Sequence, residues 1–333
     1  MSETWPIAIR DGWHPLAALD ELHGKPIGRR LLGTPIVLFR SEGKPVAMLD
    51  RCPHRALKLS DGRVRADTIA CPYHGWRFGA DGRCVEVPGS DAVPAVAVRV
   101  LPIEVRGGLI WACLAETPPP FPRLPTLLDD PTLDHFQWLV APSQMRLLDA
   151  IENMLDASHP HYVHPWFLRG TKKRKAMRVE LSLGPDGAEA IYHENARADG
   201  IMPRLLEGER TVSIGRYFPP TIGQLEFRTA RGLSVSLTAI FAPEDNDLVR
   251  PYALFSTRKG IAPAWLKRWV LKAFNLPLLR QDQRVLADQV EALKDWGAVD
   301  FAIGPADLIG PTVWRLANSK PQAVEQRVTT LYL

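Results

Sequence analysis

The sequence predicts an α+β protein of two domains: a β-rich domain, then a helix-grip-like domain in which an antiparallel sheet packs with a long late helix. Short apolar runs between turn signals predict the first domain. A segment with period-2 alternation and a long late helical pattern predict the second. The chain has 333 residues, which is enough for two domains that each bury their own core.

Residues 1–117 form the predicted β-rich domain. Its apolar runs are separated by Glu42-Gly43, Asp61-Gly62 and Asp81-Gly82. Asp-Gly between strands is a strong hairpin signal, because it accepts the positive φ angles of a type I′ turn. Gly75 directly follows His74 and suits a tight loop. We therefore expect the candidate functional side chains of this domain, the Cys and His residues described below, at hairpin tips rather than on helices.

A proline-rich segment, 118–125, predicts an extended linker, because proline removes backbone hydrogen-bond donors. The second domain then covers residues 126–333. Its predicted elements are a helix over 146–159, a strand over 233–241 with Leu233, Val235, Leu237 and Phe241 on one face, and a helical pattern over 263–296 that breaks near Pro277.

The composition is that of a globular protein, with 46% hydrophobic and 23% charged residues. The N-terminus shows no basic segment followed by an apolar one, and no apolar run approaches the ~18 residues of a spanning helix. We therefore expect a soluble, cytoplasmic protein. A net charge of +4 is too small to indicate a nucleic-acid partner. Arg169 and the run Lys172–Lys175 could dock an acidic electron carrier or an anionic substrate, but we favour a solvated loop.

Two short motifs each carry one cysteine and one histidine. Cys52-Pro-His54 and Cys71-Pro-Tyr-His74 are separated by sixteen residues. Two thiolates and two imidazoles are the ligands of a Rieske [2Fe-2S] centre, in which two Cys hold one iron and two His the other. Structural zinc also takes two Cys and two His, but the common zinc classes order them as C-x2-4-C then H-x3-5-H. The observed order favours the Rieske centre. The two remaining cysteines, Cys84 and Cys113, are expected to be buried and reduced.

A second group of candidate ligands lies early in the second domain. Asp156 and His159 are three residues apart, so a helix would place them on one face. His164 would not share that face, but Pro160 redirects the chain and lets His164 return toward His159. Two His and one carboxylate form the facial triad of non-haem Fe(II) oxygenases, which leaves positions open for O2 and substrate. Three His within six residues, counting His161, could also be a loose metal-binding tract or chance.

A third ligand has to come from a charged helical stretch far downstream. Acids in such a stretch usually form surface salt pairs. The candidates are Asp282, Asp288, Glu291 and Asp295.

The two Cys-His motifs, in the contexts Arg51-Cys-Pro-His-Arg55 and Cys71-Pro-Tyr-His-Gly-Trp-Arg-Phe78, closely resemble the Rieske domain of ring-hydroxylating and demethylating oxygenases. The respiratory Rieske type has an additional Cys in each loop, where Leu57 and Tyr73 stand here. The resemblance therefore implies the soluble, lower-potential oxygenase type. The implied cluster ligands are Cys52, His54, Cys71 and His74.

The pattern Glu-Asn-x-x-Asp-x-x-His-x4-His that ends at His164 is similar to the mononuclear-iron motif of the same oxygenases. The resemblance implies that His159 and His164 bind iron. It implies that Asp156 hydrogen-bonds an iron His and, across a subunit contact, a Rieske His. Asn153 matches a residue near the iron. His161 matches no ligand of the family and is expected to support the site or the fold.

The segment Gln281–Gln289 resembles the family pattern Asp-x-x-x-Leu-x-x-Gln, which carries the iron carboxylate. The resemblance selects Asp282 as the third ligand. The family often has Glu where Ala287 stands.

The resemblance implies the terminal oxygenase (alpha) subunit of a multicomponent Rieske system, closest to the vanillate O-demethylase and aromatic monooxygenase branch. It implies one [2Fe-2S] cluster and one mononuclear Fe(II) per subunit, O2 as co-substrate, a separate NAD(P)H-dependent reductase with or without a ferredoxin, and a homotrimer. The expected substrate is a small aromatic molecule, and family precedent suggests a carboxylate on it. Two alternatives remain: cis-dihydroxylation of an arene, and a non-catalytic Rieske electron carrier.

Overall fold

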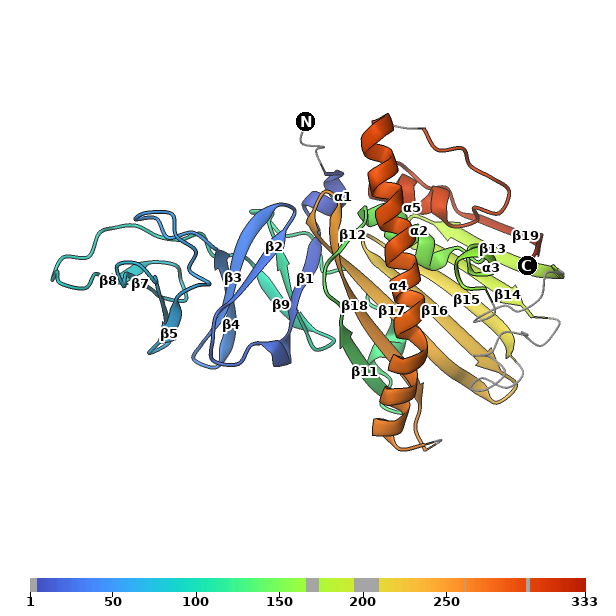
Figure 1. Cartoon of the computed structure of the whole chain (residues 1–333), viewed down its shortest axis with the longest axis horizontal. Helices are drawn as coiled ribbons and strands as arrows, with labels where there is room; N and C mark the ends of the chain where they lie inside the picture. The colour runs from blue at the N-terminus through green and yellow to red at the C-terminus, as the bar shows by residue number, and fades with distance from the viewer. Residues whose placement is uncertain (1–4, 166–173, 195–209, 261, 298–299) are drawn as a thin grey trace. The chain divides into compact units, whose positions relative to one another are not determined.

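The structure is a computed structural model of the chain (Figure 1). It describes residues 5–165, 174–194, 210–260, 262–297 and 300–333. These residues divide into two compact units. Unit 1 contains Trp5, 10–121 and 242–246, and unit 2 contains 6–9, 122–241 and 247–333, apart from the residues not described. The first change of unit after residue 10 falls inside the segment 118–125, whose role as a domain linker stays a prediction.

Unit 1 is built from small antiparallel sheets, as expected for a β-rich domain. One sheet has the order β1 (Trp13–Ala18), β10 (Leu109–Cys113), β9 (Ile103–Arg106). A second has the order β2 (Ile27–Leu31), β3 (Thr34–Ser41), β4 (Lys44–Leu49). A third has the order β5 (Arg63–Arg65), β6 (Thr68–Ala70), β7 (Arg77–Phe78), β8 (Cys84–Glu86), and a 3-10 helix (Leu19–Glu21) follows β1. The apolar run Ile36–Phe39 is fully buried in the central strand of its sheet.

Two of the three predicted turn signals in unit 1 lie in hairpins. Glu42-Gly43 joins β3 to β4 with φ angles of 49° and 76°, and Asp81-Gly82 lies between β7 and β8. Asp61-Gly62 does not form a hairpin, because it precedes β5. The β5–β6 hairpin instead turns at Ala66 and Asp67, with φ of 41° and 61°. The Asp67 carboxylate accepts a hydrogen bond from the Glu42 N–H (2.8 Å) and so helps to hold this left-handed conformation.

Unit 2 contains a nine-stranded antiparallel sheet with helices (Figure 1). The strand order is β11 (Leu133–Leu139), β18 (Leu248–Arg258), β17 (Gly232–Asp245), β16 (Ile222–Thr229), β15 (Arg210–Phe218), β14 (Gly187–His193), β13 (Ala176–Gly184), β19 (Glu325–Tyr332), and β12 (Ser143–Gln144) pairs with β18. The helices are α1 (Ile7–Arg10), α2 (Leu147–Leu155), α3 (Pro160–Val163), α4 (Ala264–Trp296) and α5 (Gly310–Ala317), with a 3-10 turn at Thr126–Asp129. Helix α2 packs on β15 and β16, and α4 contacts α2, α3 and β12. The predicted α+β class is confirmed.

The predicted helix over 146–159 is wrong in its C-terminal part. Helix α2 ends at Leu155, and Asp156 already has extended backbone angles (φ −73°, ψ 125°). The cause is local: the Asp156 carboxylate accepts hydrogen bonds from the N–H groups of Ser158 (2.7 Å) and His159 (2.9 Å). Such an Asx turn competes with the helix for these donors. Pro160 begins the next helix instead of ending the first.

The predicted break near Pro277 does not occur. Helix α4 runs without interruption from Ala264 to Trp296, with Pro277 inside it. Proline lacks the N–H that would bond to the carbonyl of Ala273, one turn earlier. Both Ala273 and Pro277 are exposed, so water can satisfy that carbonyl and the proline ring needs no space in the core.

The predicted alternation over 233–241 is interrupted by a bulge. Phe227 pairs with Val235 whereas Arg228 pairs with Leu233, which leaves Ser234 without a partner residue. A bulge of this kind shifts which side chains face each side of the sheet. Val235, Leu237 and Phe241 face the cavity described below, together with Ser234 but without Leu233.

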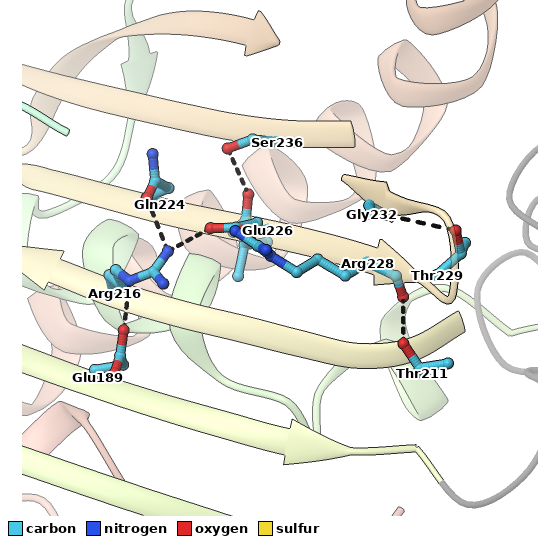
Figure 2. A network of polar contacts seen from close by, with 10 residues as sticks. Glu189, Thr211, Arg216, Gln224, Glu226, Arg228, Thr229, Gly232 and Ser236 are labelled. Carbon is cyan, nitrogen blue, oxygen red and sulfur yellow. Dashed lines mark hydrogen bonds and ion pairs between the residues drawn. The ribbon is translucent and has the colours of Figure 1, made fainter. Parts of the chain in front are cut away.

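A polar network occupies the opposite side of the same strands (Figure 2). Glu226 is 1% exposed, and its carboxylate is bound by Arg216 (2.5 Å) and by Arg228. Its neighbours Leu225 and Phe227 line the cavity, so strand alternation separates the network from the cavity. Two guanidinium groups offset the cost of burying this carboxylate.

Among the residues that the structure describes, no helix is both long enough and apolar enough to cross a membrane.

Candidate active site

The two Cys-His motifs lie on two loops of unit 1. Cys52 and His54 follow β4, whereas Cys71 and His74 lie at the tip of the β6–β7 hairpin. The expectation of hairpin tips therefore holds only for the second motif, since β4 and β5 belong to different sheets. Each loop is closed by its own backbone: the Cys52 N–H donates to the Leu57 carbonyl and the Cys71 N–H to the Trp76 carbonyl, both at 2.8 Å. Gly75 has a φ of 73°, as a tight loop requires.

These four side chains converge and suit a cluster with two thiolate and two imidazole ligands. Cys52 and Cys71 are buried, and neither forms a disulfide. The rings of His54 and His74 lie 4.6 Å apart, and the buried Nδ1 of His54 has no hydrogen-bond partner. Burial raises the pKa of the Cys52 thiol, and the neighbouring Cys71 raises it further. Metal binding would reverse this effect, because the thiolate is the metal ligand. The two other cysteines, Cys84 and Cys113, are buried and free, as predicted.

Three potential metal ligands converge in unit 2. His159 immediately precedes α3, His164 immediately follows it, and Asp282 projects from α4. Their ligand atoms all lie within 4.8 Å of one another. The Nε2 atoms of His164 and His159 lie 3.0 and 3.6 Å from the same carboxylate oxygen of Asp282. The one-turn helix that starts at Pro160 thus returns His164 toward His159.

The other ring nitrogen of each histidine has its own partner. His159 Nδ1 lies 3.0 Å from the backbone carbonyl of Asp156, and His164 Nδ1 lies 2.8 Å from the side-chain carbonyl of Gln281. Carbonyl oxygens only accept hydrogen bonds, so each Nδ1 carries the proton and each Nε2 presents a lone pair. This is how metal-binding histidines are usually oriented.

Two imidazole lone pairs and a carboxylate oxygen therefore point at one small volume. The buried Asp282 Oδ1 accepts no well-formed hydrogen bond. Such convergence is unfavourable unless a cation or a proton occupies the centre. For His164, burial lowers the pKa, but the nearby Asp282 outweighs this effect, and the net pKa is raised. Two imidazoles and one carboxylate fit Fe(II) in a facial triad.

The carboxylate of Asp156 lies beside this group but is turned to its own loop. It accepts from Ser158 and from the His159 N–H, and Oδ2 is 3.6 Å from His159 Nδ1. Burial alone would raise the pKa of this carboxyl, yet these hydrogen bonds outweigh it and lower the pKa. Asp156 is thus held ionised next to His159.

A cavity of about 490 Å³ opens next to the three ligands. His159, His164 and Asp282 line it, and so does Asn153. Strands β11 and β14 to β18 form its other walls, together with one face of α4. Most of these side chains are apolar, which is typical of a small-molecule site.

The remaining sequence candidates do not join the group. Asp288, Glu291 and Asp295 are exposed, and Glu291 pairs with Lys294 (2.7 Å). His161 lies on α3 but is not among the clustered ligands of the described residues. Arg169 and the first two residues of the basic run, Lys172 and Lys173, lie outside the described residues.

Sequence reasoning assigned no role to Gln281, although it precedes Asp282 directly. Helix α4 presents both side chains to the histidines, one to His164 Nδ1 and the other to His164 Nε2. An amide next to an acid in a helix gives no signal by itself, because which of them contacts a histidine depends on the packing of α4.

Replacing Gln281 with Leu should weaken iron binding at this group by about 10- to 100-fold, because His164 loses the acceptor that fixes its tautomer. Gln281→Glu keeps an acceptor and should retain binding. Titration of the iron-depleted protein with Fe(II), followed by iron analysis, measures both constants. Equal affinity for the Leu variant and the parent would contradict the positioning role.

Comparison with known families agrees with this geometry. Residues 12–98 match the model of the Rieske [2Fe-2S] domain, and residues 146–303 match the vanillate O-demethylase oxygenase C-terminal domain. The first match contains all four Cys and His residues, and the second contains the cluster of His159, His164 and Asp282.

Several curated proteins are similar in sequence. The chain is 38% identical over 169 residues to the oxygenase component of chloroacetanilide N-alkylformylase from Rhizorhabdus wittichii, a match that covers 47% of each chain. It is 36% identical over 171 residues to that of dicamba O-demethylase from Stenotrophomonas maltophilia, covering 47% of this chain and 48% of the relative. It is 37% identical over 171 residues to the oxygenase component of 3-ketosteroid-9-alpha-monooxygenase from Mycobacterium tuberculosis, and the match covers 48% of this chain and 44% of the relative. The matches thus span about half the length of these relatives.

Solved structures share the fold over nearly the whole chain. Dicamba monooxygenase bound to dicamba superposes with a TM-score of 0.80 at 23% identity, covering 93% of this chain and 97% of the other. NdmA from Pseudomonas putida CBB5 with caffeine superposes with a TM-score of 0.75 at 23% identity, and the match covers 92% of this chain and 90% of the other.

The chain therefore combines a Rieske [2Fe-2S] domain with an oxygenase C-terminal domain. It belongs to the Rieske non-haem iron oxygenases, in the branch that shares the vanillate O-demethylase type of C-terminal domain. Members of this family carry a [2Fe-2S] cluster and a mononuclear iron.

Proposed function

We propose that the protein is the terminal oxygenase of a multicomponent Rieske system, which hydroxylates or oxidatively demethylates a small aromatic substrate. O2 is the co-substrate, and a separate reductase supplies electrons from NAD(P)H. One observation carries this proposal: His159, His164 and Asp282 converge at the wall of a 490 Å³ apolar cavity. A pure electron carrier needs neither a second metal group nor a cavity beside it.

In this proposal Cys52, Cys71, His54 and His74 hold the cluster, and His159, His164 and Asp282 hold the mononuclear iron. The cluster would supply single electrons, and the iron would supply the activation of O2. Gln281 and the Asp156 carbonyl keep the Nε2 atoms of His164 and His159 directed at the metal. The apolar walls exclude water and place one carbon of the substrate beside the triad. Asn153 lies on the same wall and would contact O2 or substrate.

The relatives' names favour oxidation of a carbon attached to O or N over arene dihydroxylation. One relative is named dicamba O-demethylase and another chloroacetanilide N-alkylformylase. For a methyl ether, the atoms and electrons balance as ROCH3 + O2 + 2e⁻ + 2H⁺ → ROH + CH2O + H2O. Hydroxylation of the methyl carbon gives a hemiacetal that loses formaldehyde.

We further propose a homotrimer in which Asp156 links the iron histidine of one subunit to a Rieske histidine of the next. Two observations support the assignment: the Asp156 carboxylate is held ionised, and it lies 3.6 Å from His159 Nδ1. An ionised carboxylate makes stronger hydrogen bonds to imidazole N–H groups than a neutral amide does.

Replacing Asp156 with Asn should slow electron transfer between the metal sites by at least about tenfold while both stay occupied. The amide oxygen can still accept the Ser158 N–H bond and so keeps the Asx turn, but the amide NH2 group cannot replace the oxygen that accepts from the His159 N–H, and the charge is lost. Rapid mixing of the prereduced enzyme with substrate and O2 measures the oxidation rate of the cluster. The parent rate in this variant would show that Asp156 only shapes the loop.

Iron content and product analysis test the proposal as a whole. The oxygenase should hold about three irons per chain, two in the cluster and one mononuclear. With a surrogate reductase, a methyl ether substrate and ¹⁸O2, formaldehyde should form with one labelled oxygen. Two irons per chain and no O2 consumption would support the electron carrier, and a cis-diol with two labelled oxygens would support dihydroxylation.

A further inference from the structure

The cavity of unit 2 is longer than one aromatic ring requires. Its volume is about 490 Å³, whereas benzene fits a cavity of about 150 Å³. Along α4 its lining extends from Leu266 to Leu286, roughly 30 Å at ~1.5 Å per residue. Asp282 lies near one end of this stretch and Lys267 near the other. The cavity therefore accommodates a ligand of about two to three rings.

The cationic side chains on its wall are neutralised by acids. Lys267 Nζ lies 2.6 Å from Asp134, and Arg210 lies 3.4 Å from Glu194, whose side chain is 3% exposed. Among the described lining residues there is no other Arg or Lys. Away from the metal ligands, a carboxylate ligand would lose its hydration in an apolar cavity without a cation in exchange. The wall favours an uncharged ligand.

Two residues that line the cavity each carry a buried polar atom without a partner. Thr257 is 7% exposed, and its hydroxyl makes no hydrogen bond; the buried indole N–H of Trp138 makes none either. Most buried polar groups in folded proteins are paired. Thr257 precedes Arg258, whose carbonyl accepts from Lys267 (2.5 Å), so its hydroxyl lies toward the Lys267 end, far along α4 from Asp282. Both groups can donate to an oxygen acceptor of a ligand.

We propose that the substrate is an uncharged, largely apolar molecule of about two to three rings that carries a carbonyl oxygen remote from the reacting carbon. The carbonyl accepts hydrogen bonds from Thr257 and Trp138, while the reacting carbon lies beside the metal ligands. The inference rests on the proposed function and assigns a substrate class and two recognition residues to that site.

Equilibrium dialysis of the holoenzyme against three matched probes tests this class. The probes are 4-acetylbiphenyl, which is uncharged with a carbonyl, 4-ethylbiphenyl, which lacks the oxygen, and biphenyl-4-carboxylate, which is anionic. The ketone should bind about tenfold tighter than either of the others, because only it satisfies the unpaired donors without bringing a charge. Equal or tighter binding of the carboxylate, or no binding of the ketone, overturns the proposal.

Variants test whether Thr257 and Trp138 cause the tighter binding of the ketone. Thr257→Val should remove most of the ketone's advantage and leave 4-ethylbiphenyl unchanged, and Trp138→Phe should reduce the advantage. Thr257→Ser keeps the hydroxyl and should keep the advantage. Thr221→Val is the matched control, because the Thr221 hydroxyl is equally buried and unpaired but does not line the cavity.

The dialysis uses neither reductase nor O2, so its outcome is independent of turnover. A chain without oxygenase activity can still show the ketone preference, in which case only the proposed function fails. An active oxygenase whose ketone preference survives Thr257→Val overturns only this inference.

Discussion

His159→Ala and Asp282→Ala should each abolish product formation while the visible spectrum of the Rieske cluster stays intact. Each change removes one of three ligands from the group in unit 2 and leaves the Cys and His residues of unit 1 untouched. We expect iron to fall from about three to about two per chain. Activity should fall by more than ~100-fold, which is a larger loss than the removal of a hydrogen bond that supports a ligand causes. Iron analysis and product assay measure both effects.

Asp288→Ala is the matched control for these variants. Asp288 lies on the same helix but is exposed and outside the cluster, so its removal should leave iron content and activity near those of the parent. Near-parental product formation in His159→Ala or Asp282→Ala would reject that ligand assignment.

Cys71→Ser and His74→Ala should eliminate the Rieske spectrum and stop multiple turnovers. Cys71 is buried in the core of unit 1, where a hydroxyl cannot replace the thiolate as a ligand to the cluster. The mononuclear iron should remain, because its ligands lie in unit 2. Visible absorbance and iron content together separate the two sites.

Cys84→Ser is the control for the loss of a buried thiol. Cys84 is buried and free but belongs to strand β8 rather than to either loop. This variant should keep the full Rieske spectrum. A parental spectrum in Cys71→Ser would contradict the cluster assignment.

The motif spacing indicated two candidate metal groups because ligand chemistry restricts residue types strongly, and the structure brings the residues of each group together. Few arrangements other than a Rieske centre use one Cys and one His from each of two loops. The same spacing could not show that Asp156 ends helix α2, because its carboxylate competes with the helix through hydrogen bonds to Ser158 and His159. Local side-chain hydrogen bonds of this kind override a helical pattern.

Tertiary packing decided what the sequence left open. Asp282 and Asp288 are both aspartates on one helix, but only Asp282 faces the histidines. The continuity of α4 through Pro277 depends on the solvent exposure of that turn, and the bulge at Ser234 depends on its pairing with β16. None of these features has a periodicity that the sequence alone reveals.

Anomalous diffraction from crystals of the holoenzyme, recorded above and below the iron absorption edge, tests the central claim most directly. We expect one iron peak within bonding distance of His159 Nε2, His164 Nε2 and the Asp282 carboxylate, and a two-iron peak between Cys52, Cys71, His54 and His74. Zinc at either place would show no increase across the iron edge and would give a strong peak only above its own higher-energy edge, and this result would contradict the iron assignment. Absence of iron at the His159, His164 and Asp282 group in fully active crystals would contradict the account.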